Sequence, residues 1–440
     1  MNTPSGQRNP YLLPFALVCS LFFLWGIPNS MNGSLIRHFQ FALDLKRWQA
    51  GIVDSAFYFG YFVLAIPAGM FMRKFGYKRG ILLGLLLFSA GSMLFYPAAD
   101  VQSFGFFLLA LFTIASGLAF LETAANLYVT VLGDKQKAGW RINFAQSFNG
   151  LAIILGPIIG AKFIFSDLDT AELQRTKTAA ELLDYRKTEI LSVQGPYLLM
   201  GLILLAVTVL FWLTKMPEVG REEEQTQAPV SIAGLLRKYR HLALGVGAQF
   251  ANVGAQATLW GYFADFKLDF SPEKHVDVAV RYANSFFGAD PNVTLEKIAN
   301  YHFSFAMVLF LIGRVIGTSL MSRYSPQRVV SWFSFAAVAL VILAFLAGGL
   351  TAVLCIMLTF FCQSIMFPTI FALATDGLPP AESKLASSLV IMAIVGGAVM
   401  PPIAGLLSQA GGMKMALLAP LACFSFVVFY VTKGYRNATA

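Results

Sequence analysis

The chain has 440 residues, of which 57% are hydrophobic and 12% are charged, and its formal net charge is +9. Soluble domains carry about 25% charged residues, so this composition indicates a protein that lies largely within a membrane. The basic excess is then a topology signal of the loops, and nucleic-acid binding, which needs a basic soluble face, is excluded.

The first apolar run covers residues 11–35. It is too long for the apolar region of a cleavable signal peptide and has no small-residue cleavage site, so we expect it to remain as the first span. Pro28 interrupts its backbone hydrogen bonding, and neighbouring amides or water must compensate. Asn29 and Asn32 supply two such amides three residues apart.

About twelve apolar runs are long enough to cross a bilayer as helices. Their centres fall at Trp25, Tyr61, Leu87, Ala119, Ile154, Leu202, Ala251, Leu311, Leu340, Cys362, Ala393 and Val427. A charged connection at 216–240 divides them into a six-helix bundle at 1–215 and another at 241–440. The Lys and Arg residues of the short loops fall on one side if both termini are cytoplasmic. The sequence therefore predicts an all-α membrane protein with twelve transmembrane helices in two halves.

A weak internal repeat supports duplication of the two halves. Residues 69–79 follow span two and end in a Gly- and basic-rich loop, and residues 318–328 occupy the matching place after span eight. Two parallel six-helix halves around a central site are the major facilitator architecture. The loop at 69–79 resembles the loop that this superfamily has between spans two and three, although Arg73 stands where an acidic residue is usual.

Glu122 is the only ionised side chain in the apolar run 104–132. The helical rise of about 1.5 Å per residue places it roughly 18 Å from the charged end at Asp134, near the middle of a bilayer. A carboxylate at that depth is costly unless it faces a wet cavity, pairs, or takes up a proton. We therefore predict a transporter whose coupling proton binds Glu122. A purely structural, paired or hydrogen-bonded carboxylate is the alternative.

Rows of amides on spans five and seven, with Asn126 one turn beyond Glu122 on span four, suggest a sugar site. Sugar hydroxyls need paired donors and acceptors, and the apolar face of a sugar ring stacks on an aromatic side chain. On span seven, Gln256 and Trp260 each fall within roughly 20° of Gln249 around the helix. The predicted substrate-binding residues are Asn29, Asn32, Glu122, Asn126, Gln146, Asn149, Gln249, Asn252, Gln256 and Trp260.

A single polar residue in a span can also have a purely structural role. An isolated amide often only joins one helix to another, and this role is least expected for the row on span seven. Arg314 in span eight lies about 13 Å from the cytoplasmic charges by helical rise, so it could either reach the interface or neutralise a partner.

Several strings spread over nearly the whole chain match one family of carriers. They are residues 14–17, 21–25, 55–62, 121–126, 253–256, 313–314 and 367–371, together with Arg141, Asn143, Gln146 and Asn149. In these strings the chain resembles the bacterial L-fucose/proton symporters, the fucose–galactose–glucose branch of the major facilitator superfamily. The resemblance implies that Glu122 takes part in sugar recognition and proton coupling, and that Gln146 and Asn149 line the cavity.

The chain departs from this family in span one. The family has an acidic residue just after the segment that here contains Asn29 and Asn32, and Gly33 stands in its place. In span four, Leu127 replaces the usual proline. Glu122 alone could still carry a proton, or the carrier could use sodium or transport without coupling. Asp54, near the outer end of span two, is the nearest substitute acid.

We therefore predict a monomeric, multi-pass monosaccharide importer of the inner membrane that works by alternating access and needs no cofactor or metal beyond a proton gradient. L-Fucose is the first candidate by resemblance, and D-glucose, D-galactose, D-mannose and N-acetylglucosamine are alternatives. An exporter of drugs or metabolites is a rival of another class, and it should have a larger, more apolar pocket. The sequence contains no catalytic triad, metal-spaced His/Cys set or phosphate-binding loop to support an enzyme. No role is assigned to the outer loop 265–300.

Overall fold

The computed structural model describes residues 11–45, 47–163, 178–217, 231–271, 281 and 295–435, with some side chains inside these ranges, including 29–38, left out. The first-half helices are α1 (Leu12–Ala42), α2 (Arg47–Phe75), α3 (Tyr77–Val101), α4 (Phe104–Val131), α5 (Ala138–Phe163), α7 (Ala179–Ser192) and α8 (Gln194–Leu213). The later helices are α10 (Ile232–Lys238), α11 (Arg240–Gly261), α12 (Phe263–Phe270), α14 (Leu295–Leu320), α15 (Pro326–Ala347), α16 (Gly349–Gln363), α17 (Met366–Ala374), α18 (Pro380–Met392), α19 (Gly396–Ala416) and α20 (Leu418–Phe429). Short 3₁₀ or π turns make up the remaining helical elements, and these described ranges contain no strand.

Each predicted span corresponds to one helix or to two helices in succession. Within the described residues, eight helical segments are long and apolar enough to cross a membrane, and shorter apolar stretches lie at Leu12–Pro28 and Leu418–Gly434. Helix α11, which carries an amide row, is not among the eight. Span ten is broken between α16 and α17, and span eleven is broken between α18 and α19.

Local sequence explains where several helices begin or end. Ser103 accepts a hydrogen bond from the N–H of Phe106 at the start of α4, and Ser325 accepts one from the N–H of Arg328 at the start of α15. The Nζ of Lys78 donates to the carbonyls of Trp212 and Thr214 across 2.7 and 2.8 Å. These are carbonyls at the end of α8 that the helix itself leaves unpaired.

The contacts divide the chain into two compact units. The first comprises Met1–Asp134, Leu151–Ala228 and Ser383–Met392, and the second comprises Lys135–Gly150, Pro229–Glu382 and Ala393–Ala440. Part of α18 thus packs in the first unit, where the Ser387 hydroxyl donates to the Thr123 carbonyl across 2.8 Å. The first part of α5 packs in the second unit. The predicted division at 215 and 241 stays a prediction, because 218–230 lies outside the described residues.

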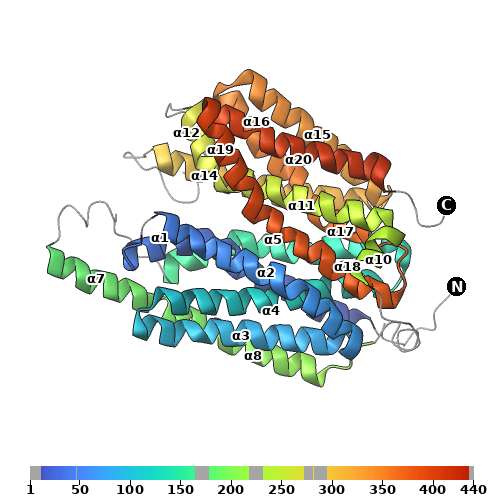
Figure 1. The fold of residues 1–440 in the computed structure, drawn as a ribbon, viewed down its shortest axis with the longest axis horizontal. Helices are drawn as coiled ribbons and strands as arrows, with labels where there is room; N and C mark the ends of the chain where they lie inside the picture. Colours follow the sequence, from blue (N-terminus) through green and yellow to red (C-terminus); the bar gives the residue numbers. More distant parts are fainter. Residues whose placement is uncertain are drawn as a thin grey trace. The chain divides into compact units, whose positions relative to one another are not determined.

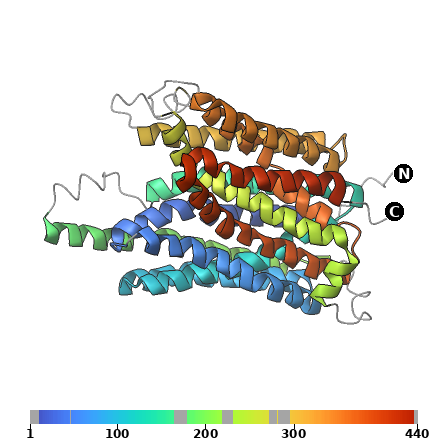
Figure 2. The same cartoon turned by 45° about the horizontal axis from the view of Figure 1, so that its top comes forward.

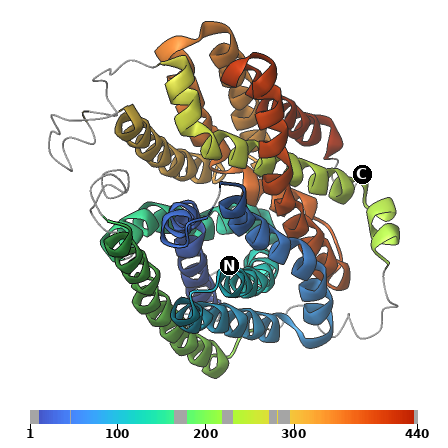
Figure 3. The ribbon, with the colours of Figure 1, turned by 60° about the vertical axis from the view of Figure 1, so that its left-hand side comes forward.

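In the first unit, α3 packs against α4 and α8, and α2 packs against α4 (Figure 1). Glycine allows the close approach of α3 and α4, because a Cβ on Gly117 would lie 2.5 Å from the backbone nitrogen of Phe88. The rings of Phe95 and Tyr197 stack with centroids 3.7 Å apart between α3 and α8. Figure 3 shows these helices more nearly end-on.

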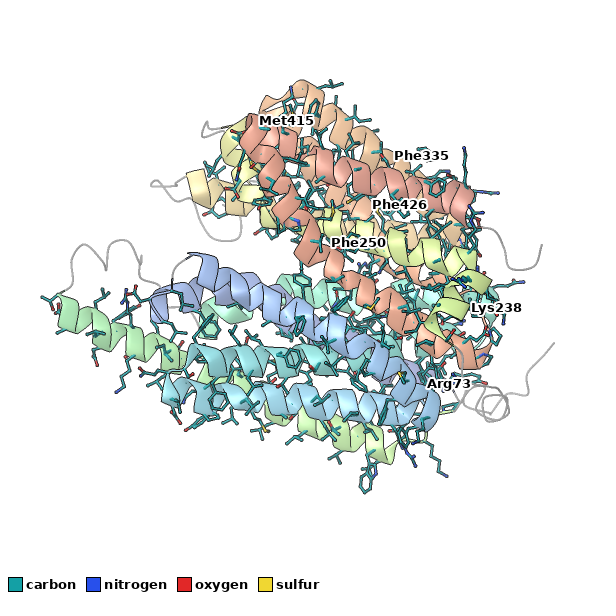
Figure 4. All side chains as sticks on the ribbon, in the orientation of Figure 1. Arg73, Lys238, Phe250, Phe335, Met415 and Phe426 are labelled. Atoms are coloured by element: carbon teal, nitrogen blue, oxygen red, sulfur yellow. The ribbon has the colours of Figure 1, made fainter. Side chains whose placement is uncertain are left out.

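In the second unit, α11 packs against α17, α19 and α20, while α15 packs against α16 and α20 (Figures 1 and 2). Phe250, labelled in Figure 4, marks where α19 crosses α11. A Cβ on Gly396 would lie 2.1 Å from the carbonyl oxygen of Phe250, so only glycine permits this crossing. The four cysteines of the chain, two in this unit's α16, are free thiols and all are buried; they are Cys19, Cys355, Cys362 and Cys423.

Candidate functional site

Glu122 is buried in α4 and hydrogen-bonded to a tyrosine of α2. Its side chain is 6% exposed, and the hydroxyl of Tyr61, itself 1% exposed, donates to Oε1 across 2.5 Å. Gly60, next to Tyr61, brings the two helices together, because a Cβ there would lie 2.7 Å from the Cβ of Ala115 on α4. The close helix contact therefore positions the phenol against the carboxyl group.

No cation balances this carboxyl group within the described part of the chain. The ion pairs between described side chains join Arg186 to Asp44 and Lys238 to Glu382. A buried carboxylate without a counter-charge is expensive in a low dielectric, and a proton removes that cost. A protonatable group thus lies at this buried position, and Tyr61 is its described hydrogen-bond donor.

The other α4 residue of the predicted site, Asn126, is fully buried one helical turn beyond Glu122. Thr123 lies between them in sequence, and its carbonyl accepts the hydrogen bond from Ser387 of α18. The polar turn of α4 therefore lies beside both α2 and the part of α18 that belongs to the first unit.

The amide row of α5 lies in the second unit, and one of its members joins helices. Asn143 joins helices: its Nδ2 donates to the Gly139 carbonyl across 2.9 Å and to Oγ1 of Thr369, on α17, across 3.2 Å. This is the helix-joining role that a polar residue in a span often has. Gln146 and Asn149, the predicted substrate residues of this row, are both buried.

Arg314 of α14 connects α5 with the break between α16 and α17. It is 3% exposed, its Nε donates to the Ser364 carbonyl across 2.8 Å, and its Nη1 donates to the Gln146 carbonyl. The guanidinium also lies 4.7 Å from the ring centroid of Phe310, a cation–π contact. Arg314 therefore does not reach the interface, and its partners in the described residues are carbonyls and a ring rather than a carboxylate.

The row on α11 contains buried amide atoms that the surrounding protein does not satisfy. Asn252 is fully buried, and neither its Oδ1 nor its Nδ2 has a hydrogen-bond partner among the described residues. Gln249 is also fully buried, and its only described bond is a long one of 3.5 Å to the Phe367 carbonyl. Because buried polar groups are normally paired, these atoms indicate a polar ligand or water as their partner.

Aromatic rings lie at the other end of this row. Trp260 is half-buried and stacks on Phe360 with centroids 5.5 Å apart, while Phe310 meets it edge-on at 5.4 Å. The indole Nε1 of Trp260 has no partner within the described residues. Gln256, one turn before Trp260, is half-buried. The predicted combination of amides and an aromatic face on α11 is therefore present in the structure.

The structure describes eight of the ten predicted substrate residues and divides them between the units. Glu122 and Asn126 belong to the first unit, whereas the α5 and α11 residues belong to the second. The side chains of Asn29, Asn32 and Asp54 lie outside the described residues, although α1 runs through the first two and α2 through the third. Whether these residues bind substrate stays a prediction.

Two polar side chains of interest were not predicted from the sequence. Tyr61 gave no polar signal because it lies in the aromatic stretch 57–62. Gln363 could have been found, since it is an amide in an apolar span. It is 2% exposed at the end of α16, its Nε2 donates to Oγ1 of Thr359, and its Oε1 has no partner among the described residues.

Known proteins resemble this chain over nearly its full length. A family model described as Major Facilitator Superfamily matches residues 15–394. The L-fucose-proton symporter of Escherichia coli (strain K12) is 38% identical over 442 residues, covering 99% of this chain and 96% of the relative. A glucose/galactose transporter of Brucella abortus biovar 1 (strain 9-941) is 31% identical over 439 residues, covering 99% and 98%.

A solved structure shows the same architecture. The crystal structure of the major facilitator transporter FucP in the outward conformation superposes with a TM-score of 0.82 at 36% identity, covering 97% of this chain and 100% of that one. The predicted all-α membrane fold with twelve helices is thereby confirmed, as is the resemblance found in the sequence.

Proposed function

Because the chain belongs to the major facilitator superfamily, we propose that it is a membrane-embedded carrier that imports a monosaccharide together with a proton. L-Fucose is the first candidate substrate, since the E. coli relative is an L-fucose-proton symporter. Glucose and galactose follow, since the Brucella relative transports them by name. These relatives are transporters, so an enzymatic function is set aside.

The buried Glu122 supports proton coupling more than any other single observation. It lies in the middle of an apolar helix, its described hydrogen bond comes from a neutral phenol, and no described cation neutralises it. Neutralising it with a proton lowers the cost of carrying it through a low-dielectric environment. A proton that binds with the sugar and leaves with the sugar would make transport of one depend on the other.

The sugar would bind amide and aromatic groups such as those of α11. Asn252 and Gln249 offer donors and acceptors that lack good partners within the described residues, and Trp260 offers an aromatic face. This pattern favours a hydroxylated ligand over the apolar cargo of a drug exporter. It does not select one monosaccharide, because an amide can both donate and accept.

Gly33 limits the proposed stoichiometry. With glycine at the family's acidic position in span one, Glu122 is the proposed single coupling group, and transport would carry at most one proton per sugar. Sodium coupling and uncoupled transport are the competing mechanisms. The carrier is proposed to be a monomer of the inner membrane. Both termini would be cytoplasmic, because the short loops rich in Lys and Arg then lie inside.

Uptake of radiolabelled sugars into vesicles tests this function. We expect L-fucose uptake to rise as the external medium is made acidic, to collapse with a protonophore, and to be indifferent to a sodium gradient. Unlabelled glucose, galactose, mannose and N-acetylglucosamine, added as competitors, would define the substrate range. A sodium requirement, or uptake that ignores pH and both gradients, would contradict proton symport.

A further inference from the structure

Tyr61 is the described side chain that contacts the Glu122 carboxyl group. We propose that Tyr61 is a positioning residue that holds Glu122 in both of its protonation states and so sets the pH range over which transport is coupled. The inference rests on the proposed role of Glu122 as the proton site, and it assigns to Tyr61 no direct contact with the sugar.

The contact is a hydrogen bond between two buried side chains. The Tyr61 to Glu122 distance is 2.5 Å, and both side chains are buried. Water competes little at such a site, so the phenol contributes strongly to the energy of the ionised carboxylate.

A phenol can serve both states of the carboxyl group because it donates and accepts. When Glu122 is ionised, the Tyr61 O–H donates to Oε1. When a proton from the aqueous side has bound Glu122, the carboxyl O–H can donate to the phenol oxygen. Tyr61 keeps its own proton in both states, so the proton gained and later lost belongs to Glu122 alone.

Other titratable groups lie on α4 and on the elements packed against it, and three of them have described partners elsewhere. The Nζ of Lys384, on α18, lies 4.5 Å from the ring centroid of Tyr77, the first residue of α3. The next residue of α3, Lys78, donates to a carbonyl at the end of α8. Tyr128, on α4 itself, donates to the Pro217 carbonyl across 2.9 Å. The remaining described titratable side chains of α1, α2 and α3 are Cys19, Tyr58, Arg73, Lys74, Arg79, Tyr96 and Asp100. Of the described titratable side chains on these elements, Tyr61 is the one that forms a hydrogen bond with Glu122.

Helix spacing explains why Tyr61 can hold its place. Phe57, one turn before it, packs with its ring centroid 5.5 Å from that of Tyr61. Gly60 fixes the approach of α2 to α4 on an adjacent face. The phenol is therefore restrained by packing on its own helix and by close contact with the next, as a positioning residue should be.

The test compares Tyr61→Phe with Tyr128→Phe, which also deletes a buried, hydrogen-bonded hydroxyl but one that does not contact Glu122. Proton-driven sugar uptake is measured against external pH for both variants and the wild type. Without the phenol the ionised carboxylate loses a donor, so the proton is retained to higher pH. We expect the half-maximal pH of uptake to rise by about one unit or more in Tyr61→Phe, a tenfold change in proton affinity, and to stay unchanged in Tyr128→Phe.

Incorporation of 3-fluorotyrosine at position 61 supplies a variant of nearly unchanged shape. Its hydroxyl is a stronger donor, so we expect the half-maximal pH to move in the opposite direction. If both changes at position 61 leave the pH profile in place, and Tyr61→Phe lowers only the melting temperature, Tyr61 is a packing residue and the inference is wrong. The proposed function fails separately, namely if Glu122→Gln still accumulates sugar.

Discussion

Arg314 donates from Nε to the carbonyl of Ser364 across 2.8 Å, at the point where span ten breaks between α16 and α17. The same guanidinium donates to the Gln146 carbonyl on α5. A buried charge thus joins three helices through main-chain atoms. Gly150 lies at this contact of α5 with α14, where an added Cβ would be 3.3 Å from Cδ1 of Leu311.

We predict that Arg314→Met destabilises the protein by about 1–3 kcal/mol, because carbonyls that it now satisfies lose their donors. The stability of Arg314→Lys should lie between those of the wild type and Arg314→Met, since an ammonium lacks the planar fork that reaches two separate carbonyls. Melting temperatures of the purified proteins in detergent would measure this. Arg323→Met, at an exposed position, is the control and should change little. A fully stable Arg314→Met variant would show that the guanidinium is dispensable to the fold.

Glu122→Gln mimics the protonated carboxyl group permanently. We expect it to abolish accumulation of sugar against a gradient and the alkalinisation that accompanies uptake, because no proton can be bound or released. Exchange of labelled for unlabelled sugar should survive, since it needs no net proton movement. Asp134→Asn, at the exposed end of the same span, serves as the control for loss of a carboxylate. Wild-type accumulation by Glu122→Gln would remove Glu122 from the coupling mechanism.

The amides of α11 and α5 should respond differently to truncation. Asn252→Ala removes groups that have no partner among the described residues, so we expect sugar affinity to fall about fivefold to 150-fold with little change in melting temperature. Gln256→Ala should weaken binding in the same range. Asn143→Ala breaks bonds to Gly139 and Thr369, so its main effect should be on stability. Binding by calorimetry and thermal melts distinguish the two, and the reverse pattern would exchange the assigned roles.

Gly33→Asp restores an acidic residue at the position where the family has one. A second titratable group should broaden or split the dependence of uptake on external pH, and the larger side chain should narrow the range of accepted sugars. Gly33→Asn, similar in size but without charge, separates the two effects because it should narrow the range and leave the pH profile alone. An unchanged pH profile in Gly33→Asp would show that position 33 does not take part in proton binding.

The sequence predicted the fold well because span length and loop charge are local properties. It also found Glu122, since a single charge in an apolar run needs no partner to be noticed. It could not find Tyr61, because nothing in α2 alone says that one aromatic side chain among several reaches α4. Nor could it show that Asn143, in the amide row of α5, bonds to Thr369. That contact depends on which helix lies opposite, and this is a long-range property of the packing.

The burial of the four cysteines has a practical consequence for experiments. Cys19, Cys355, Cys362 and Cys423 are each no more than 5% exposed. A water-soluble maleimide should therefore leave the unmodified chain almost unlabelled in the state described. Single thiols introduced at exposed positions could then be followed in the native background, so that sugar-dependent changes in accessibility are read without first building a cysteine-free carrier.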